Sequence, residues 1–170
     1  MYIDTHCHVF SEYYDDIEEI VRKCKENNVT KIIVSGCDMK SNMEVLELVN
    51  KYDIIYGTIG FHPTELDAFK EEYFNFLIDN INNTKIVGIG EIGLDYYYDE
   101  PERAVQLKWF ERQLQMAVEV NKPVIIHSRE ACADTINILK NGNADRIGGI
   151  IHCYSYTKES VKIFYDMNFY

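Results

Sequence analysis

Three features are missing from this sequence of 170 residues: a long apolar run, a paired cysteine pattern and an excess of positive charge. No apolar run approaches the ~20 residues needed to cross a bilayer, and residues 1–4 lack the basic-then-apolar start of a secretory signal. The five cysteines are scattered without CxxC spacing, so neither a disulfide framework nor a zinc ribbon is indicated. We therefore expect a cytoplasmic protein with free thiols and no membrane partner.

Positive charge is scarce, because 17 Lys and Arg residues face 28 Asp and Glu residues and leave a net charge of −11. This balance argues against a protein that coats nucleic acid, since such proteins gain affinity by neutralising phosphates. It leaves open an enzyme that grips phosphates through bound metal ions. A hydrophobic content of 46% is enough for a real core. No linker, repeat or low-complexity tract interrupts the chain, so we expect residues 1–170 to form a single domain.

Short apolar or β-branched runs alternate with stretches of helical periodicity. The runs lie at residues 2–4, 31–34, 54–59, 85–89, 123–126 and 149–151, and residues 168–170 resemble the start of a seventh. Apolar stripes between them predict helices through Ile17/Ile20/Val21/Cys24, Val45/Leu48/Val49/Tyr52, Phe69/Tyr73/Phe76/Leu77, Leu107/Phe110/Leu114/Ala117, Cys132/Ile136/Leu139 and Val161/Phe164/Tyr165. Repeated strand–helix units predict an α/β fold with a parallel sheet and right-handed crossovers.

The histidines share one property: each lies at the C-terminal end of an expected strand. These positions are His6 and His8 after the first run, His62 after the third, His127 after the fifth and His152 after the sixth, with Glu91 at the end of the fourth. The carboxyl ends of parallel strands meet at one rim, where α/β folds carry their chemistry. Each residue alone has a structural explanation, as a surface pair, a loop-bonded carboxylate or a core histidine. Together they predict a site for divalent metal ions, with a carboxylate able to bridge two of them.

Other residues near this rim leave alternatives open. Residues 88–93 match the GxGxxG dinucleotide pattern, but no helix is expected until after Pro101, so glycines that let backbones pass close to Glu91 explain the pattern better. Arg129 either stabilises a phosphoryl oxygen or forms a surface ion pair. We interpret Cys7 and Cys153 as small hydrophobic residues that face the packed side. They are not expected to be nucleophiles, because no dedicated base is evident for either thiol. The rim tyrosines could stack nucleobases, although aromatic loop packing is favoured; they are Tyr96, Tyr97, Tyr98, Tyr154 and Tyr156.

Five ordered segments carry a family resemblance: IDTHCH at residues 3–8, GFHP at 60–63, GEIGLDY at 90–96, PVIIHSR at 123–129 and HCYS at 152–155. Over essentially its whole length the chain resembles the TatD family of metal-dependent deoxyribonucleases. The resemblance implies a (β/α)8 TIM barrel of the metal-dependent hydrolase type, of which about six βα units, the N-terminal two-thirds, are present.

The same resemblance implies two divalent ions, Mg, Mn or Zn, at the C-terminal rim. His6 and His8 would hold one ion, His127 and His152 the other, and Glu91 would bridge both. His62 is similar to the family's substrate-contacting histidine, and Arg129 stands at a matching polar position. Glu91, His62 and Arg129 are therefore the catalytic candidates.

Two departures from the family pattern stand out. The family usually has a small residue where this chain has Tyr156, so the loop after His152 is expected to differ in shape. The family's remaining metal-binding aspartate lies near the end of the eighth strand, and this chain ends before it. Because a complete barrel needs roughly 250 residues, we expect a missing C-terminal barrel segment as a partner.

The primary hypothesis is a divalent-metal-dependent nuclease, an exonuclease acting on single-stranded or terminal DNA through a metal-activated water. One alternative is a metallohydrolase of a small ester, lactone or amide, because fold and ligands do not fix the substrate. Another is an inactive fragment that needs its missing C-terminal segment. The sequence decides neither the native metal nor the oligomeric state.

Overall fold

Six parallel strands form one curved sheet in the computed structural model of the chain, which describes residues 1–66, 70–98 and 100–170. In space the strands follow their order in the sequence, and every neighbouring pair is parallel. Their bounds are β1 Tyr2–Cys7, β2 Val29–Ser35, β3 Ile55–Ile59, β4 Ile86–Asp95, β5 Val124–Arg129 and β6 Gly149–Ile151.

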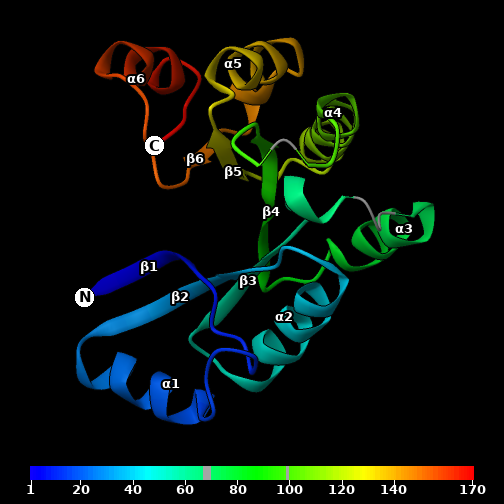
Figure 1. Cartoon of the computed structure of the whole chain (residues 1–170). Coiled ribbons are helices and arrows are strands. Elements are labelled where there is room, and N and C mark those ends of the chain that lie inside the picture. Colours follow the sequence, from blue (N-terminus) through cyan, green and yellow to red (C-terminus); the bar gives the residue numbers. More distant parts are fainter. Residues whose placement is uncertain (67–69, 99) are drawn as a thin grey trace.

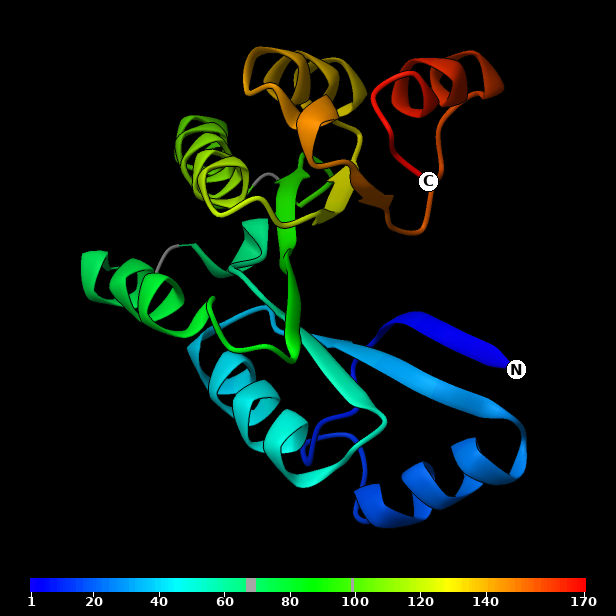
Figure 2. The same cartoon turned by 180° about the vertical axis from the view of Figure 1, so that it is seen from behind.

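The helices connect successive strands and lie on the outer side of the curved sheet (Figures 1 and 2). Their bounds are α1 Ile17–Glu26, α2 Met39–Lys51, α3 Glu71–Asn80, α4 Arg103–Glu119, α5 Cys132–Asn141 and α6 Lys158–Tyr165, with short 3-10 turns at Pro63–Glu65 and Ala144–Arg146. The sheet therefore has the form of a half-barrel with β1 and β6 towards its two ends, as expected from the sequence.

Local signals in the sequence explain where the helices begin. Asp16 caps α1 by accepting a hydrogen bond from the backbone of Glu19 at 3.0 Å. Asp38 and Ser41 form a reciprocal capping box at the start of α2. The predicted apolar stripes face the sheet: Val21, Val45 and Leu77 are all buried. One stripe residue, Phe69, lies outside the described residues.

Burial separates the centre of the sheet from its edge. In β4 nine of the ten residues are buried, which is typical of a parallel strand covered on both faces. In β1, by contrast, Tyr2 and Ile3 are exposed. At the other end, Tyr170 donates its backbone N–H to Gly149 at 3.0 Å, and Phe169 pairs in parallel with Gly149. Where the start of a seventh strand was expected, the structure thus has an isolated bridge beside β6.

The fourth strand is longer than the sequence predicts. Glu91 was expected at its end and a loop from Leu94, but β4 continues to Asp95 and places Glu91 in its middle. The strand continues because it pairs with β5 through Ile92 and Gly93, after a register shift beyond Ile89. His6 and His127 likewise lie within strands rather than after them.

The glycine pattern of residues 88–93 has a steric explanation. Gly93 has a φ of +144°, and a Cβ at this position would lie 1.9 Å from the carbonyl oxygen of His127. Only glycine allows β4 and β5 to approach this closely. This confirms close backbone passage, rather than dinucleotide binding, as the reason for the pattern.

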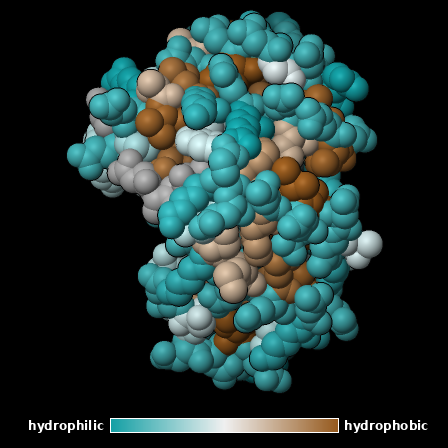
Figure 3. All heavy atoms as spheres, turned by 90° about the vertical axis from the view of Figure 1, so that its right-hand side faces the viewer, coloured by the Kyte–Doolittle hydropathy of each residue, from teal (hydrophilic) through white to brown (hydrophobic). Residues whose placement is uncertain are grey.

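The outer face over α2 to α4 is mainly hydrophilic, with apolar patches between the charged side chains (Figure 3). Among the described residues, no helix combines the length and apolar character needed to cross a membrane.

Candidate metal centre

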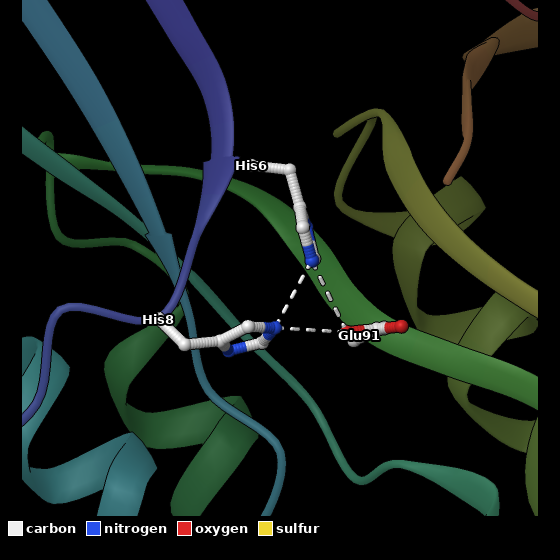
Figure 4. A group of neighbouring side chains, drawn as sticks. All are labelled: His6, His8 and Glu91. Carbon is white, nitrogen blue, oxygen red and sulfur yellow. Dashed lines mark hydrogen bonds and ion pairs between the residues drawn. The ribbon is translucent and has the colours of Figure 1, made fainter. Parts of the chain in front are cut away.

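Glu91 stands between two groups of histidines. Glu91 belongs to β4, and the residue is only 3% exposed. One carboxylate oxygen, Oε2, faces His6 and His8 of the first strand and its following loop (Figure 4). The other oxygen, Oε1, faces His127, and His62 and His152 lie slightly farther from it. The sequence expectation that distant histidines meet around Glu91 therefore agrees with the geometry.

The first group is compact. Nε2 of His6 lies 3.1 Å from Nε2 of His8, and the two nitrogens lie 3.4 Å and 3.5 Å from Glu91 Oε2. A tetrahedral ion with bonds of ~2.0–2.1 Å has donor–donor edges of about 3.3 Å. The three atoms therefore have the spacing of one face of a metal coordination shell, and imidazole with carboxylate is a donor set suited to first-row divalent ions.

Ser35 of β2 holds both rings of this first group. Its backbone carbonyl lies 3.1 Å from Nδ1 of His8, and its hydroxyl lies 3.1 Å from Nδ1 of His6. A carbonyl can only accept, so Nδ1 of His8 carries the proton and Nε2 keeps its lone pair for an ion. Sequence reasoning did not identify Ser35; its place at the end of a strand beside β1 was the available signal.

The second group is looser. Nδ1 of His127 lies 3.2 Å from Glu91 Oε1, whereas Nε2 of His62 and Nε2 of His152 each lie 3.9 Å from it. Glu91, His62 and His127 offer donor atoms within 4.8 Å of one another. The ring of His152 instead lies 3.8 Å from that of His6, centroid to centroid. His62 was expected to contact substrate and His152 to bind the ion, but both lie equally close to Glu91 Oε1.

Asp95 is a residue of the site that sequence reasoning missed. It is 1% exposed, and its Oδ2 lies 2.9 Å from Nε2 of His127. Its Oδ1 accepts the backbone N–H groups of Tyr97 and Tyr98 at 3.0 Å and 3.1 Å. A period-two step along β4 places Asp95 on the same face as Glu91, which was the signal available in the sequence.

Three buried amide side chains hold the backbone around the site. Asn42 of α2 pairs with both the N–H and the carbonyl of Gly60, and Gln113 of α4 does the same for Phe61, directly before His62. Gln106 of α4 pairs in this way with Asp95. Each amide replaces a missing strand neighbour, so the helices fix the positions of the loops that carry site residues.

Hydrogen bonding and burial set the protonation of the site. Although burial raises it, contacts with His127, His6 and His8 hold the pKa of Glu91 far below its usual value. A hydrogen bond with Glu91 raises the pKa of His8, against the effect of burial. Burial lowers the pKa of His127, but Glu91 and Asp95 outweigh it and raise this pKa. Burial and the neighbouring His127 lower the pKa of His62 to about 4, so His62 is neutral at pH 7.

Arg129 and the tyrosines lie around the site rather than in it. The guanidinium of Arg129 lies 3.7 Å from the ring centroid of Tyr97, and Arg129 itself is exposed. The hydroxyl of Tyr156 lies 2.7 Å from that of Ser128 and accepts the backbone N–H of Ala131 at 3.1 Å. The large residue at position 156 thus ties the loop after His152 to β5 and to the start of α5.

The cysteines divide by environment. Burial and Asp4 raise the pKa of Cys7 to about 12, as expected for an unreactive thiol. Cys153 is exposed, so its expected place on the packed side is wrong; it stands in a turn with a φ of +47°. Sequence reasoning also missed Cys37, whose Sγ lies 3.9 Å from Nδ1 of His8 and 4.0 Å from Glu91 Oε2.

Comparison with known proteins shows the family of the chain. A family model described as "TatD related DNase" matches residues 3–170. The chain belongs to the TatD family of metal-dependent hydrolases. It is 39% identical over 171 residues to an uncharacterized metal-dependent hydrolase, YabD, of Bacillus subtilis, covering 100% of this chain and 67% of that protein. It is 29% identical to the uncharacterized metal-dependent hydrolase YcfH of Escherichia coli, covering 99% of this chain and 64% of that one.

Solved TatD structures share the fold. The crystal structure of YjjV, a TatD homologue from Escherichia coli, superposes with a TM-score of 0.92 at 30% identity and covers 99% of this chain and 66% of its own. A TatD family hydrolase from Entamoeba histolytica superposes with a TM-score of 0.87 at 22% identity over 99% of this chain and 63% of its own, and shows the fold alone. The chain thus spans about two thirds of the length of the relatives it matches.

Proposed function

We propose that this TatD protein is a deoxyribonuclease that uses two divalent ions, Mg, Mn or Zn, to hydrolyse phosphodiester bonds from an end of DNA. The supporting observation is the position of Glu91, whose two oxygens face different groups of imidazoles. When bound, such ions lower the pKa of a coordinated water towards neutrality and neutralise non-bridging phosphate oxygens. His6 and His8 would hold one ion and His127 and His152 the other, with Glu91 between them.

The surrounding residues have roles that follow from their contacts. Asp95 fixes the ring of His127 through Nε2. Neutral His62 offers its ring to a substrate oxygen from the same cluster. Arg129, on the strand that carries His127, presents a planar guanidinium for a phosphate. Bound cations also explain how a chain with a net charge of −11 could bind DNA, because they would attract phosphates locally.

One observation favours a smaller substrate. A cavity of about 280 Å³ adjoins His8 and Cys37, and acidic side chains dominate its lining: Glu12, Asp38, Glu44 and Glu65, with Lys40 paired to Glu12. Such a lining repels a polyanion. Hydrolysis of a small ester, lactone or amide is therefore the second candidate.

The test is to incubate end-labelled single-stranded DNA with the 170-residue chain and Mg²⁺ or Mn²⁺, and to compare simple esters and amides under the same conditions. We expect the wild-type chain to cleave DNA when the metal is present. Cleavage should be lost when a chelator is added and in the Glu91→Ala variant. Equal cleavage by Glu91→Ala would refute the metal mechanism, and turnover of esters without cleavage of DNA would favour the second candidate. Inactivity that is reversed by adding a C-terminal TatD segment would support that segment as the partner.

A further inference from the structure

A cation and two aromatic rings form an exposed cluster at the end of β4 and β5. The guanidinium carbon of Arg129 lies 3.7 Å from the ring centroid of Tyr97 and 5.4 Å from that of Tyr98. The two rings meet edge to face, with centroids 5.1 Å apart. Tyr97 is 54% and Tyr98 62% exposed, in contrast to buried Tyr96. Loop packing therefore accounts for Tyr96 but leaves Tyr97 and Tyr98 exposed, with Arg129 against the ring of Tyr97.

The charge of Arg129 is available for a ligand. Within residues 1–66, 70–98 and 100–170, no carboxylate forms an ion pair with Arg129. Arg22 and Arg112, by contrast, are paired with Glu19 and Glu71. No side-chain hydrogen bond of Arg129 is found among these described residues either, so its N–H groups can bind a phosphate oxygen while its guanidinium carbon lies over Tyr97.

The cluster is tied to the candidate metal centre by one carboxylate. Asp95 accepts the backbone N–H groups of Tyr97 and Tyr98 with Oδ1 and contacts His127 with Oδ2. In the strand register the backbone of Arg129 stands beside that of Asp95. Arg129 also follows His127 by two residues, which places both of these side chains on the same face of β5. A ligand on these rings is thus held at a fixed offset from His127.

We infer that Tyr97, Tyr98 and Arg129 form a platform that binds single-stranded nucleic acid, with a base stacked on a tyrosine ring and the adjoining phosphate on Arg129. This inference rests on the proposed function and assigns it a substrate subsite. Every base has a π face, so such a platform accepts any sequence. A single strand fits best because its bases can leave their own stack, whereas those of a duplex are already stacked and paired.

The experiment compares two labelled strands of equal length with nuclease-resistant phosphorothioate linkages, one oligothymidylate and one abasic. Binding to the metal-loaded protein is followed by fluorescence anisotropy. Base stacking is worth roughly a tenfold gain in affinity per base, so we expect the thymidylate strand to bind about tenfold or more tightly than the abasic strand. The one phosphate contact with Arg129 should contribute only about −0.7 to the slope of log affinity against log salt.

Variants locate the effect. The double substitution Tyr97→Leu/Tyr98→Leu should abolish the difference between the two strands, and Tyr97→Phe/Tyr98→Phe should restore it, because the rings and not the hydroxyls stack. Arg129→Lys keeps the charge but loses the planar stack, so the difference should shrink. Tyr165→Leu on α6 is the matched control, since Tyr165 is 66% exposed and lies on another element.

The outcomes separate this inference from the proposed function. Base-dependent binding without cleavage of ordinary DNA would keep the platform and reject the nuclease. Cleavage with equal affinity for both strands would keep the nuclease and overturn the platform. Failure to bind either strand would overturn the platform regardless of how the double variant folds, because the wild-type comparison stands alone.

Discussion

The two oxygens of Glu91 face environments of different quality. On the Oε2 side, His6 and His8 converge with nitrogen–oxygen distances of 3.4 Å and 3.5 Å, and Ser35 holds both rings from behind. On the Oε1 side, His127 lies at 3.2 Å while His62 and His152 lie at 3.9 Å, and the other nitrogen of His127 already contacts Asp95. The donor atoms of the first side already have the spacing of a coordination shell, whereas the imidazoles of the second side would have to move closer together to hold the second proposed ion. We therefore expect the first ion to bind more tightly than the second.

Removing the shared carboxylate should erase this difference. We predict that Glu91→Ala loses both ions, with affinity reduced by well over a hundredfold, because even loss of a residue that only supports a ligand costs 10–100-fold. The measurement is metal content after dialysis, by elemental analysis. Glu72→Ala, an exposed glutamate on α3, is the control and should match wild type. Retention of two ions by Glu91→Ala would show that the bridge is not needed.

Substituting the residues that hold the histidines on each side of Glu91 should change the affinities of the two ions separately. Asp95→Asn keeps the shape but weakens the contact with His127, so we predict a 10–100-fold loss in affinity for the weaker ion only. Ser35→Ala should weaken the tighter ion by less, because the backbone carbonyl of residue 35 still holds His8. Calorimetric titration of each variant resolves the two binding steps. An equal effect of Asp95→Asn on both steps would contradict the assignment of the two sides.

The sequence predicted the fold because its signals were local. Short apolar runs such as 31–34 and periodic stripes such as Val45, Leu48 and Val49 are enough to place strands and helices, and their alternation predicts the parallel sheet. The length of β4 could not be predicted from the sequence. Its second half depends on pairing with β5 beyond a register shift, and it contains Gly93, a residue type more typical of loops than of strands.

The candidate site was predicted in its residue types but not in its spacing. That strands end with His6, His8, His127 and His152 is visible in the sequence, since parallel strands share a rim. Strand curvature and ring rotamers decide which histidine approaches which oxygen of Glu91. The sequence alone therefore could not predict that His62 lies close to Glu91. The positions of Asp95 and Ser35 near strand ends are visible in the sequence, but their contacts with His127 and His6 join neighbouring strands and could not be predicted from it.

Acidity should affect the imidazoles that contact Glu91. Metal binding requires unprotonated imidazole, and the pKa of His8 is raised chiefly by its hydrogen bond with Glu91. A raised pKa means that His8 keeps its proton to higher pH, so affinity for the first ion should rise as pH rises through that pKa and then level off. Over one pH unit the change is at most about tenfold per displaced proton.

Calorimetry in two buffers of different ionisation enthalpy counts the protons released for each ion. We expect more release at pH 6 than at pH 8. In Glu91→Gln the imidazole loses its carboxylate partner, so its pKa falls and proton release at pH 6 should decrease in any binding that remains. Equal release at both pH values in wild type would contradict the role of His8 as a titrating ligand.

The smallest expected effect concerns the loop that carries His152. Tyr156→Phe removes a hydroxyl that contacts Ser128 and accepts the N–H of Ala131, while the ring and its packing remain. We predict a loss of about 1–3 kcal/mol in the free energy of unfolding, at ~0.5–1.5 kcal/mol for each of the two hydrogen bonds, seen as a drop of at least about 2–4 °C in Tm. Because His152 lies 3.9 Å from Glu91 Oε1 but its ring also lies 3.8 Å from that of His6, we expect the weaker ion to lose more affinity than the tighter one. A matched loss at both ions would mean that Tyr156 supports the sheet as a whole, and that the two sides of Glu91 are not independent.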